Sequence, residues 1–386
     1  MRGGTLKGPV ERIYLDWNAS APLSPGALAA ATHALTLGGN ASSVHGEGRA
    51  ARQLVERTRA ALASRFAVPR DQVLFTSGGT EANATALCPG ILTPAGRPVE
   101  RLIASAVEHP AVLAGGRFDP THVHTVPVDA NGVIDKAGLS DALSDGPPSL
   151  VSVMAANNET GVLQPLAEIA AIAADHDALL HTDAVQAFGR IPDEALVADL
   201  ITLSGHKLGG PVGAGALIRR RAVELPALVR GGGQEKGMRG GTENVTAIAG
   251  LGAALSEPAA DPNAWAETKA ARIEFEAALK ERFSATVFGE AAPRLPNTTL
   301  AALPGMPAEI ALIALDLAGT AISSGSACSS GKVATSHVLA AMGVSQPLAD
   351  TALRISAGPI GAAEAYERFL LALGEVIVSA QRRAIS

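Results

Sequence analysis

Three short segments of the sequence contain residues that could perform chemistry together, and the first is suited to phosphate. Residues 76–83 read TSGGTEAN, a glycine-rich turn between a β-rich run and an alanine-rich run. Free N–H groups at a helix start, beside residues small enough to permit close approach, form an anion site. The segment predicts a phosphate-binding turn, although a tight strand-to-helix connection without a ligand has the same composition.

Lys207 is the candidate nucleophile. It lies in SGHKLGGPVGAG, residues 204–215, between a histidine and a glycine-rich loop and directly after an apolar run. A lysine at the carboxyl end of a sheet strand can be desolvated, release its proton and attack a carbonyl, as Schiff-base lysines do. A solvent-exposed surface lysine is the alternative interpretation.

Asp183 is the candidate partner of a cation. It ends an apolar run in HTDAVQ, residues 181–186. A carboxylate there needs a positive partner, and a protonated pyridine nitrogen would supply one, although a helix-capping aspartate is also possible. A phosphate turn, a Schiff-base lysine and a strand-end aspartate together predict pyridoxal 5'-phosphate as the cofactor.

The elements that must position these residues read as an α/β fold. Short runs that are apolar on both faces alternate with alanine-rich amphipathic stretches, as in a mainly parallel sheet with helices on both sides. The predicted strands are VLFT (73–76), LIAS (102–105), LVSVMAA (150–156), ALLHTD (178–183) and LITLS (200–204). Ser24 and Pro25 predict the start of one earlier helix, and a second is expected over 48–66.

A composition break at EPAADPN, residues 257–263, predicts the main domain boundary. Beyond it we expect a long helix over 265–283, a helix near 307–317, a strand at LRIS and a terminal helix to about residue 381. The predicted organisation is an N-terminal arm joining the small domain (1–24), a large cofactor-binding domain (25–260) and a small α+β domain with Cys328 (261–386).

Composition excludes several classes of function. The chain has 386 residues, of which 47% are hydrophobic and 18% charged, and it carries 31 basic and 37 acidic residues for a net charge of −6. This balance supports a large core and predicts no direct nucleic-acid binding. No apolar run suggests a membrane helix or a signal peptide, so we expect a cytoplasmic protein. The two cysteines, Cys88 and Cys328, lack metal-ligand spacing; Cys88 reads as a buried small hydrophobe and Cys328 as a reactive thiol in an exposed loop of small residues.

Further motifs carry a resemblance that covers nearly the whole chain. They are IYLDWNASAPL (13–23), NASSVHGEGRAAR (40–52), EHPAV (108–112), NNETG (157–161), GGGQEKGMRGGTEN (231–244), SSGSACSSG (323–331) and LRIS (353–356). With the three segments above, in this order, the chain resembles the cysteine desulfurases, within the fold-type I, class V aminotransferase group of pyridoxal phosphate enzymes. The resemblance implies a mainly parallel seven-stranded sheet in the large domain.

The resemblance also implies roles for individual residues. Lys207 would bind the cofactor aldehyde, Asp183 would pair with the pyridine nitrogen, and His109 would stack on the ring. Gln186 and Asn158 would lie near its phenolic oxygen, and Asn158 would also contact the substrate. Arg354 would bind the substrate carboxylate. Thr242 would reach the phosphate bound in the partner subunit of a homodimer. The residues that would hold the phosphate within one subunit are Gly79, Thr80, Ser204 and His206.

The implied reaction removes sulfur from L-cysteine and gives L-alanine and a persulfide on Cys328. Lys207 would take the Cα proton, and His109 would manage the substrate thiol proton. The sulfur would pass to an acceptor or iron–sulfur scaffold protein, for nitrogenase maturation, general iron–sulfur assembly or tRNA thiolation. Other possibilities are a selenocysteine lyase, another class V aminotransferase-like enzyme, or a non-catalytic scaffold, which would need none of these residues.

Overall fold

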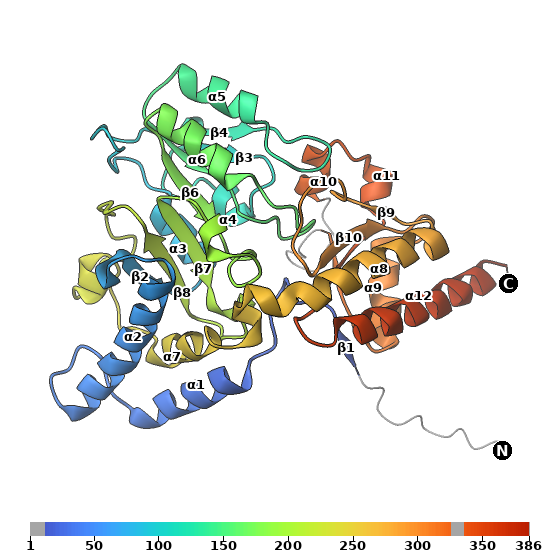
Figure 1. Ribbon diagram of the computed structural model, residues 1–386, viewed down its shortest axis with the longest axis horizontal. Helices are drawn as coiled ribbons and strands as arrows, with labels where there is room; N and C mark the ends of the chain where they lie inside the picture. Colours follow the sequence, from blue (N-terminus) through green and yellow to red (C-terminus); the bar gives the residue numbers. More distant parts are fainter. Residues whose placement is uncertain (1–11, 326–335, 386) are drawn as a thin grey trace.

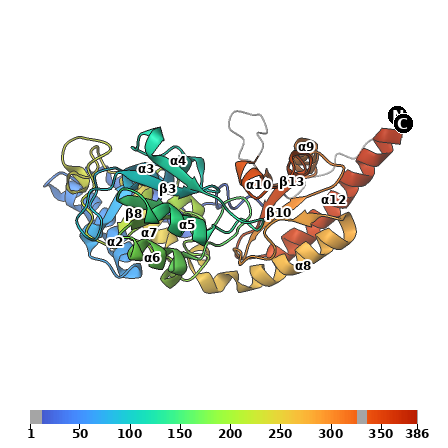
Figure 2. The ribbon, with the colours of Figure 1, turned by 90° about the horizontal axis from the view of Figure 1, so that it is seen from above.

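A computed structural model describes residues 12–325 and 336–385, with side chains to residue 379 (Figure 1). Cys328 and the loop predicted around it lie outside these ranges. Two units stand side by side, each with its own sheet (Figure 2). Within the described ranges, none of the helices combines the length and apolar character needed to span a bilayer.

The larger unit contains the predicted mainly parallel sheet of seven strands, in the order β2-β8-β7-β6-β5-β3-β4. Only β8 runs in the direction opposite to that of the other strands. The strands are β2 (Val73–Thr76), β3 (Arg101–Ser105), β4 (Val123–Val126), β5 (Ser149–Ser152), β6 (Leu179–Asp183), β7 (Leu200–Ser204) and β8 (Gly215–Arg219). All except β4 are buried along their whole length, which explains why their sequences are nearly continuous apolar runs.

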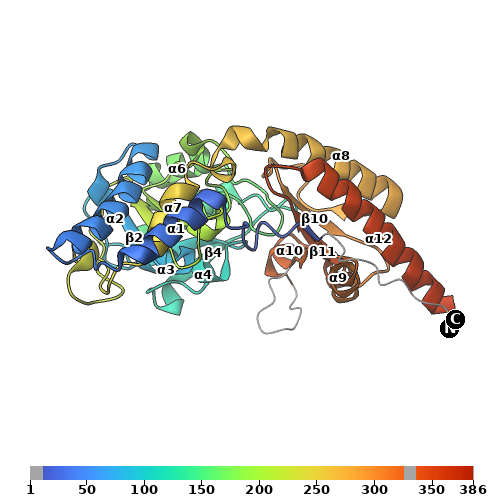
Figure 3. The same cartoon turned by 90° about the horizontal axis from the view of Figure 1, so that it is seen from below.

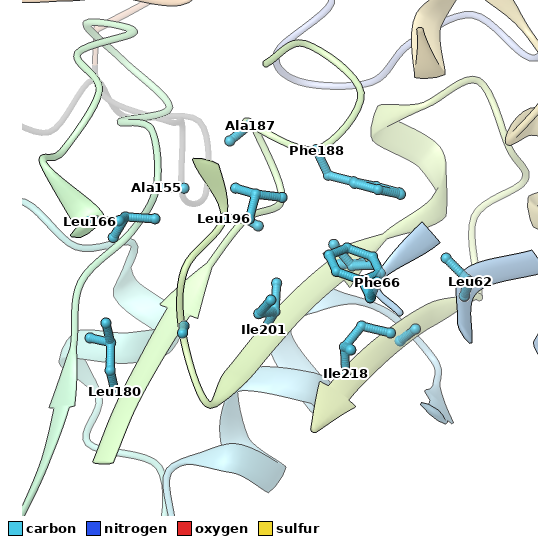
Figure 4. Close-up of a cluster of buried hydrophobic side chains, with 14 of the residues drawn as sticks. Leu62, Phe66, Ala155, Leu166, Leu180, Ala187, Phe188, Leu196, Ile201 and Ile218 are labelled. Carbon is cyan, nitrogen blue, oxygen red and sulfur yellow. The ribbon is translucent and has the colours of Figure 1, made fainter. Parts of the chain in front are cut away.

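Helices cover both faces of this sheet. The helices are α1 (Pro25–Leu37), α2 (Gly46–Arg65), α3 (Gly79–Ala86), α4 (Pro110–Leu113), α5 (Lys136–Ser144), α6 (Leu166–Asp175) and α7 (Val245–Ala254). One core cluster joins α2, α5, α6 and α7 to one face. Leu180, Ile201 and Ile218 of three neighbouring strands belong to it, and Phe66 and Leu62 lie on the side of Ile218 (Figure 4). The preceding residue on each of these strands points to the other face, which packs against α3 and α4; these residues are Leu179, Leu200 and Leu217.

The smaller unit is an antiparallel sheet with helices packed against it. Its strands, in the order β12-β13-β10-β9, are Ser323–Ser324, Ala352–Ser356, Thr298–Ala302 and Thr286–Val287. The helices are α8 (Ala266–Phe283), α9 (Ala308–Leu317), α10 (His337–Ala341), α11 (Gln346–Ala349) and α12 (Ala362–Ile385). Helices α8 and α12 pack side by side (Figure 3).

The N-terminal arm reaches this smaller unit. Strand β1 (Ile13–Tyr14) pairs in parallel with β11 (Thr320–Ala321). Ile13 and Leu15 are buried in the same core cluster as α8 and α12. The domain limits at residues 24 and 260 remain a prediction.

Local signals behave as expected, with three differences. Ser24 caps α1 by accepting from the Ala27 N–H, and Cys88 is buried just after α3. The run 150–156 forms a shorter strand, because the Met154 N–H bonds to the Glu108 carboxyl instead of continuing the ladder to β3. The other two differences are two strands that the apolar runs did not predict. Strand β4 is partly polar, and β8 follows directly on the glycine-rich loop.

Candidate active site

A cavity of about 450 Å³ opens at the carboxyl ends of β6 and β7, beside the start of α3. Ligand sites in α/β proteins typically lie at this edge of the sheet, and this volume suits a small organic ligand. The structure brings most of the predicted site residues to its wall. These are Gly79, Thr80, His109, Asn158, Asp183, Gln186, Ser204, His206, Lys207 and Arg354.

Lys207 follows β7 in a short 3-10 turn, which places its amine in the cavity wall. Its Nζ donates to the carbonyl oxygens of Asn18 at 2.5 Å and Ala19 at 2.8 Å. Burial, helped by the nearby cations Arg354 and Arg190, lowers the pKa of Lys207 to about 7. A large share of this amine is therefore unprotonated at neutral pH, as a nucleophile or base requires.

Asp183 is the last residue of β6 and is nearly buried at the cavity wall. One carboxylate oxygen accepts from the Val185 N–H at 2.9 Å and the other from Asn83 Nδ2 at 2.7 Å. These two donors fix the orientation of the carboxylate and compensate its burial.

The start of α3 provides an anion cradle. Gly78 caps the helix without a side-chain hydrogen bond, so the first N–H groups of the helix have no intrahelical acceptor. A Cβ on Gly79 would lie 2.9 Å from Val185 Cγ2, so only glycine fits there without displacing Val185. Ser204 and His206 line the same cavity. Burial and the charge of Lys207 lower the pKa of His206 to about 4, so this histidine is neutral at pH 7.

His109 begins α4 and is half-buried in the cavity wall. Its Nδ1 accepts from the Ala111 N–H at 3.1 Å, which assigns the proton of the neutral ring to Nε2. Burial lowers the pKa of His109, and the charges of Lys207 and His337 act in the same direction. A neutral imidazole at pH 7 can accept or pass on a proton.

Arg354 lies in the middle of β13 in the smaller unit, with its guanidinium at the cavity. It donates to Asp16 Oδ1 at 2.9 Å and to the Asn158 carbonyl at 3.1 Å. Its Nε–H is buried and has no acceptor among the described residues. An arginine with an unused donor at a cavity is suited to bind a carboxylate.

Sequence reasoning assigned no role to Asn18, which connects the two units at the cavity. Its carbonyl accepts from Lys207 and from Gln186 Nε2, and its Oδ1 accepts from Arg190 Nη1 at 2.7 Å. Its Nδ2 donates to Thr298 of the smaller unit. Asn83 was also not predicted, although its position one helical turn after Gly79 in TSGGTEAN was a usable signal.

Thr242 is absent from the lining of this cavity. It is exposed and lines a separate hollow of about 190 Å³ with Ser77 and Asn244. In its own chain it is therefore not part of the lysine cavity. Cys328 lies outside the described residues, so its place relative to Lys207 remains a prediction.

The residues present fit pyridoxal phosphate. The cofactor needs an amine for its aldehyde, a carboxylate for its ring nitrogen and an anion site for its phosphate. Lys207, Asp183 and the uncapped start of α3 supply these three groups around one cavity. The lack of space for a side chain at Gly79 is typical of a backbone that approaches a phosphate closely.

Comparisons with known proteins agree with this geometry. The sequence model of the class-V aminotransferase family matches residues 13–368. A cysteine desulfurase of Cereibacter sphaeroides is 40% identical over 385 residues, which cover 98% of each chain. The X-ray structure of a NifS-like protein from Rickettsia africae is 34% identical with a TM-score of 0.84, covering 95% of this chain and 99% of that one.

A third relative, SspA, was solved in complex with cysteine. It is 31% identical with a TM-score of 0.74, covering 90% of this chain and 99% of that one. Enzymes of this family depend on pyridoxal phosphate. The chain belongs to the class-V aminotransferases and, among them, to the cysteine desulfurase family.

Proposed function

We propose that this protein is a cysteine desulfurase that converts L-cysteine to L-alanine and retains the sulfur as a persulfide on Cys328. One observation carries the proposal: a lysine amine with a pKa near 7, an oriented carboxylate and an arginine with a free donor share one cavity. Full-length relatives named cysteine desulfurase, and the similar SspA structure with cysteine, support the reaction and the substrate.

The cofactor, when bound, supplies an aldehyde for the substrate amine and a ring that takes up the electron pair released at the substrate Cα. Asp183 would bind the ring nitrogen and keep it protonated. Gln186 and Asn158 would lie near the phenolic oxygen, and His109 would stack on the ring. Lys207, with its amine unprotonated, would take the substrate Cα proton and hold it for return.

Arg354 binds the substrate carboxylate. Its guanidinium is fixed by Asp16 and the Asn158 carbonyl, so the substrate meets an oriented donor rather than a flexible one. Nη1 and Nη2 each carry a second N–H that these two bonds do not use. Asn158 contacts the substrate from the same wall.

Cys328 receives the sulfur. Its thiolate forms a bond to the substrate sulfur as the substrate Cβ–S bond breaks, and the carbon product leaves as L-alanine after protonation. The balance is L-cysteine plus enzyme thiol giving L-alanine plus enzyme persulfide, so no external oxidant or reductant is consumed. His109 accepts the substrate thiol proton.

The phosphate contacts are divided between two copies of the chain in this proposal. Gly79, Thr80, Ser204 and His206 bind the phosphate within one subunit, and Thr242 reaches the phosphate in the other subunit of a homodimer. The exposed position of Thr242 outside its own cavity supports this division. The final acceptor is a sulfur-acceptor or iron–sulfur scaffold protein, and one relative is named a putative cysteine desulfurase IscS 1, from Bacillus subtilis. The cytoplasmic location also remains a prediction.

Cys328→Ala tests the proposed function. The purified variant should keep its bound cofactor, with the absorbance that borohydride bleaches, and lose alanine production from L-cysteine. Lys207→Ala should lose both, because no other amine among the described lining residues faces the cavity. Cys88→Ala is the matched control, since Cys88 is buried beyond α3 and should leave both readouts unchanged.

Three results would each contradict the assignment. Unchanged alanine production in Cys328→Ala would show that no second nucleophile is needed, as in a transaminase. A wild-type protein with neither cofactor absorbance nor alanine production would instead support a non-catalytic scaffold. A third outcome is that Cys328→Ala releases alanine from selenocysteine but not from L-cysteine. This outcome would identify a selenocysteine lyase.

A further inference from the structure

Glu159 is a buried acidic residue to which the proposed mechanism assigns no role. It follows Asn158 in the NNETG turn and is 3% exposed. Its Oε2 accepts a hydrogen bond of 2.5 Å from the hydroxyl of Ser336. A buried carboxyl is costly unless a partner compensates it, so this contact holds two separate parts of the fold together.

Ser336 places this hydrogen bond next to the segment that contains Cys328. It is the first described residue after 326–335, the segment that contains Cys328. Its Oγ also accepts from the Leu339 N–H at 3.0 Å and thereby caps α10. Glu159 therefore fixes the place where the chain enters α10.

The other end of that segment meets the same carboxyl. Gly325 is the last described residue before it, and its N–H donates to the Ala352 carbonyl at 3.3 Å. A Cβ built on Gly325 would lie 3.7 Å from Glu159 Oε2, which is ordinary van der Waals contact. Gly325 and Ser336 thus both lie against Glu159, although ten residues of chain separate them.

The Glu159 backbone directly follows Asn158, which lines the cavity. The N–H groups of Glu159 and Thr160 both donate to Asn157 Oδ1 at 2.9 Å, which fixes the turn. The neighbouring Asn158 carbonyl accepts from Arg354 and from Asn18. Burial raises the pKa of Glu159 to about 7, while the Ser336 hydrogen bond and the charge of Arg354 favour its ionised form.

On the basis of the proposed function, we infer that Glu159 is a positioning residue for Cys328. Its hydrogen bond fixes the Ser336 end of the segment that contains the thiol, with the Gly325 end close by, beside the turn that carries Asn158. It thereby sets how readily the thiol reaches the substrate sulfur, without touching the substrate itself. Misplacement of a reacting group by about 1 Å can cost about a hundredfold in rate, so a fixed base for this segment has a large kinetic effect.

Glu159→Ala tests this inference in the cofactor-loaded protein with two measurements. Single-turnover persulfide formation, followed by the added mass of one sulfur atom on the Cys328 peptide, should slow roughly tenfold to a hundredfold. Alkylation of Cys328 by iodoacetamide in the absence of L-cysteine should become several-fold faster, with the buried Cys88 as the internal reference. Cofactor absorbance and its spectral response to L-cysteine should stay close to wild type, because Lys207 and Arg354 keep their own contacts.

Glu159→Gln separates the hydrogen bond from the charge. Its amide oxygen can still accept from Ser336, so persulfide formation should remain within about threefold of the wild-type rate. If persulfide formation is as slow in Glu159→Gln as in Glu159→Ala, this hydrogen bond does not position the thiol. Glu159→Gln also keeps the test decisive if the alanine variant fails to fold.

Ser336→Ala removes the hydroxyl that donates to Glu159, so it should slow persulfide formation by the same factor as Glu159→Ala. The variant that carries both substitutions should be no slower than either single variant. Ser24→Ala is the matched control for losing a helix cap, since Ser24 caps α1 and its side chain does not line the cavity. Additive losses, or unchanged persulfide formation and alkylation in Glu159→Ala, overturn the inference. If the proposed function itself is wrong, the wild-type protein will form no persulfide. The alkylation rates of Cys328 in wild type and Glu159→Ala would still show whether Glu159 positions the thiol.

Discussion

At the scale of single residues, the environment of Lys207 decides whether the cavity can bind an aldehyde. Two backbone carbonyls of the N-terminal arm accept hydrogen bonds from its amine and hold it in place. Arg190 and Arg354 disfavour a third positive charge nearby, and burial removes the water that would stabilise it. Position and protonation state are thus set by different features, the first by the arm and the second mainly by burial, helped by Arg354 and Arg190.

The cofactor-free protein should capture an aldehyde with a pH dependence that reflects this environment. With a pKa of about 7, roughly a tenth of the Lys207 amine is unprotonated at pH 6 and most of it at pH 8. The rate of Schiff-base formation with pyridoxal should therefore rise about tenfold between these values and then level off. Borohydride trapping and mass spectrometry of the Lys207 peptide measure it, with Lys207→Ala as the blank. A rate that still climbs steeply above pH 9 would mean an ordinary lysine.

At the scale of elements, the cavity depends on how closely β8 approaches the start of α3. A Cβ on Gly215, the first residue of β8, would lie 2.6 Å from the Gly78 carbonyl carbon and 2.8 Å from the Leu203 oxygen. Both contacts are with backbone, which cannot rotate away. The strand therefore needs glycine here to bring the phosphate turn against β7.

Gly215→Ala should push the start of α3 away from the sheet. We expect a loss of about 1–3 kcal/mol in unfolding free energy and weaker binding of pyridoxal phosphate. Gly374→Ala is the matched control: a Cβ on Gly374 in α12 meets no atom within 4 Å, so alanine should stabilise the protein by ~0.5–1 kcal/mol. Denaturant unfolding and cofactor titration report the two effects. Full stability and cofactor affinity in Gly215→Ala would show that the turn tolerates a shift.

At the scale of the whole molecule, the proposed homodimer makes a prediction about mixed subunits. Thr242→Ala should weaken cofactor binding at the partner's site, and Lys207→Ala should abolish activity at its own site. A mixed dimer would contain one complete site, with the intact Lys207 of one subunit served by Thr242 of the other. Random mixing should therefore restore about a quarter of wild-type alanine production.

This recovery is measured after unfolding and refolding the two variants together, with separately refolded samples as controls. Recovery requires that the two residues come from different subunits. If the mixed sample is no more active than the two separate samples together, Thr242 does not contribute to the partner subunit's site. Sedimentation of each variant checks that dimers form.

The sequence was sufficient to name most of the residues that line the cavity and much of the sheet, for identifiable physical reasons. Lys207 and Asp183 follow buried strands, so their position relative to the sheet could be predicted from apolar runs. Asn18 could not be assigned in this way, because its contact with Lys207 uses a backbone carbonyl, which any residue type provides. Strand β4 escaped notice because its residues are half exposed and partly polar, and its pairing with β3 is tertiary.

The ion pair between Asp16 and Arg354 joins residues that are 338 positions apart. At elongation rates of about 5–20 residues per second, the ribosome adds the arginine roughly 20 to 70 s after the aspartate. Late in that interval the nascent polypeptide already contains Lys207, Asp183 and residues that bond to Asn18, but Asp16 still lacks its arginine. A product truncated before β13 should therefore release its coenzyme more readily than the finished polypeptide, because one contact that holds the arm at the cavity is missing.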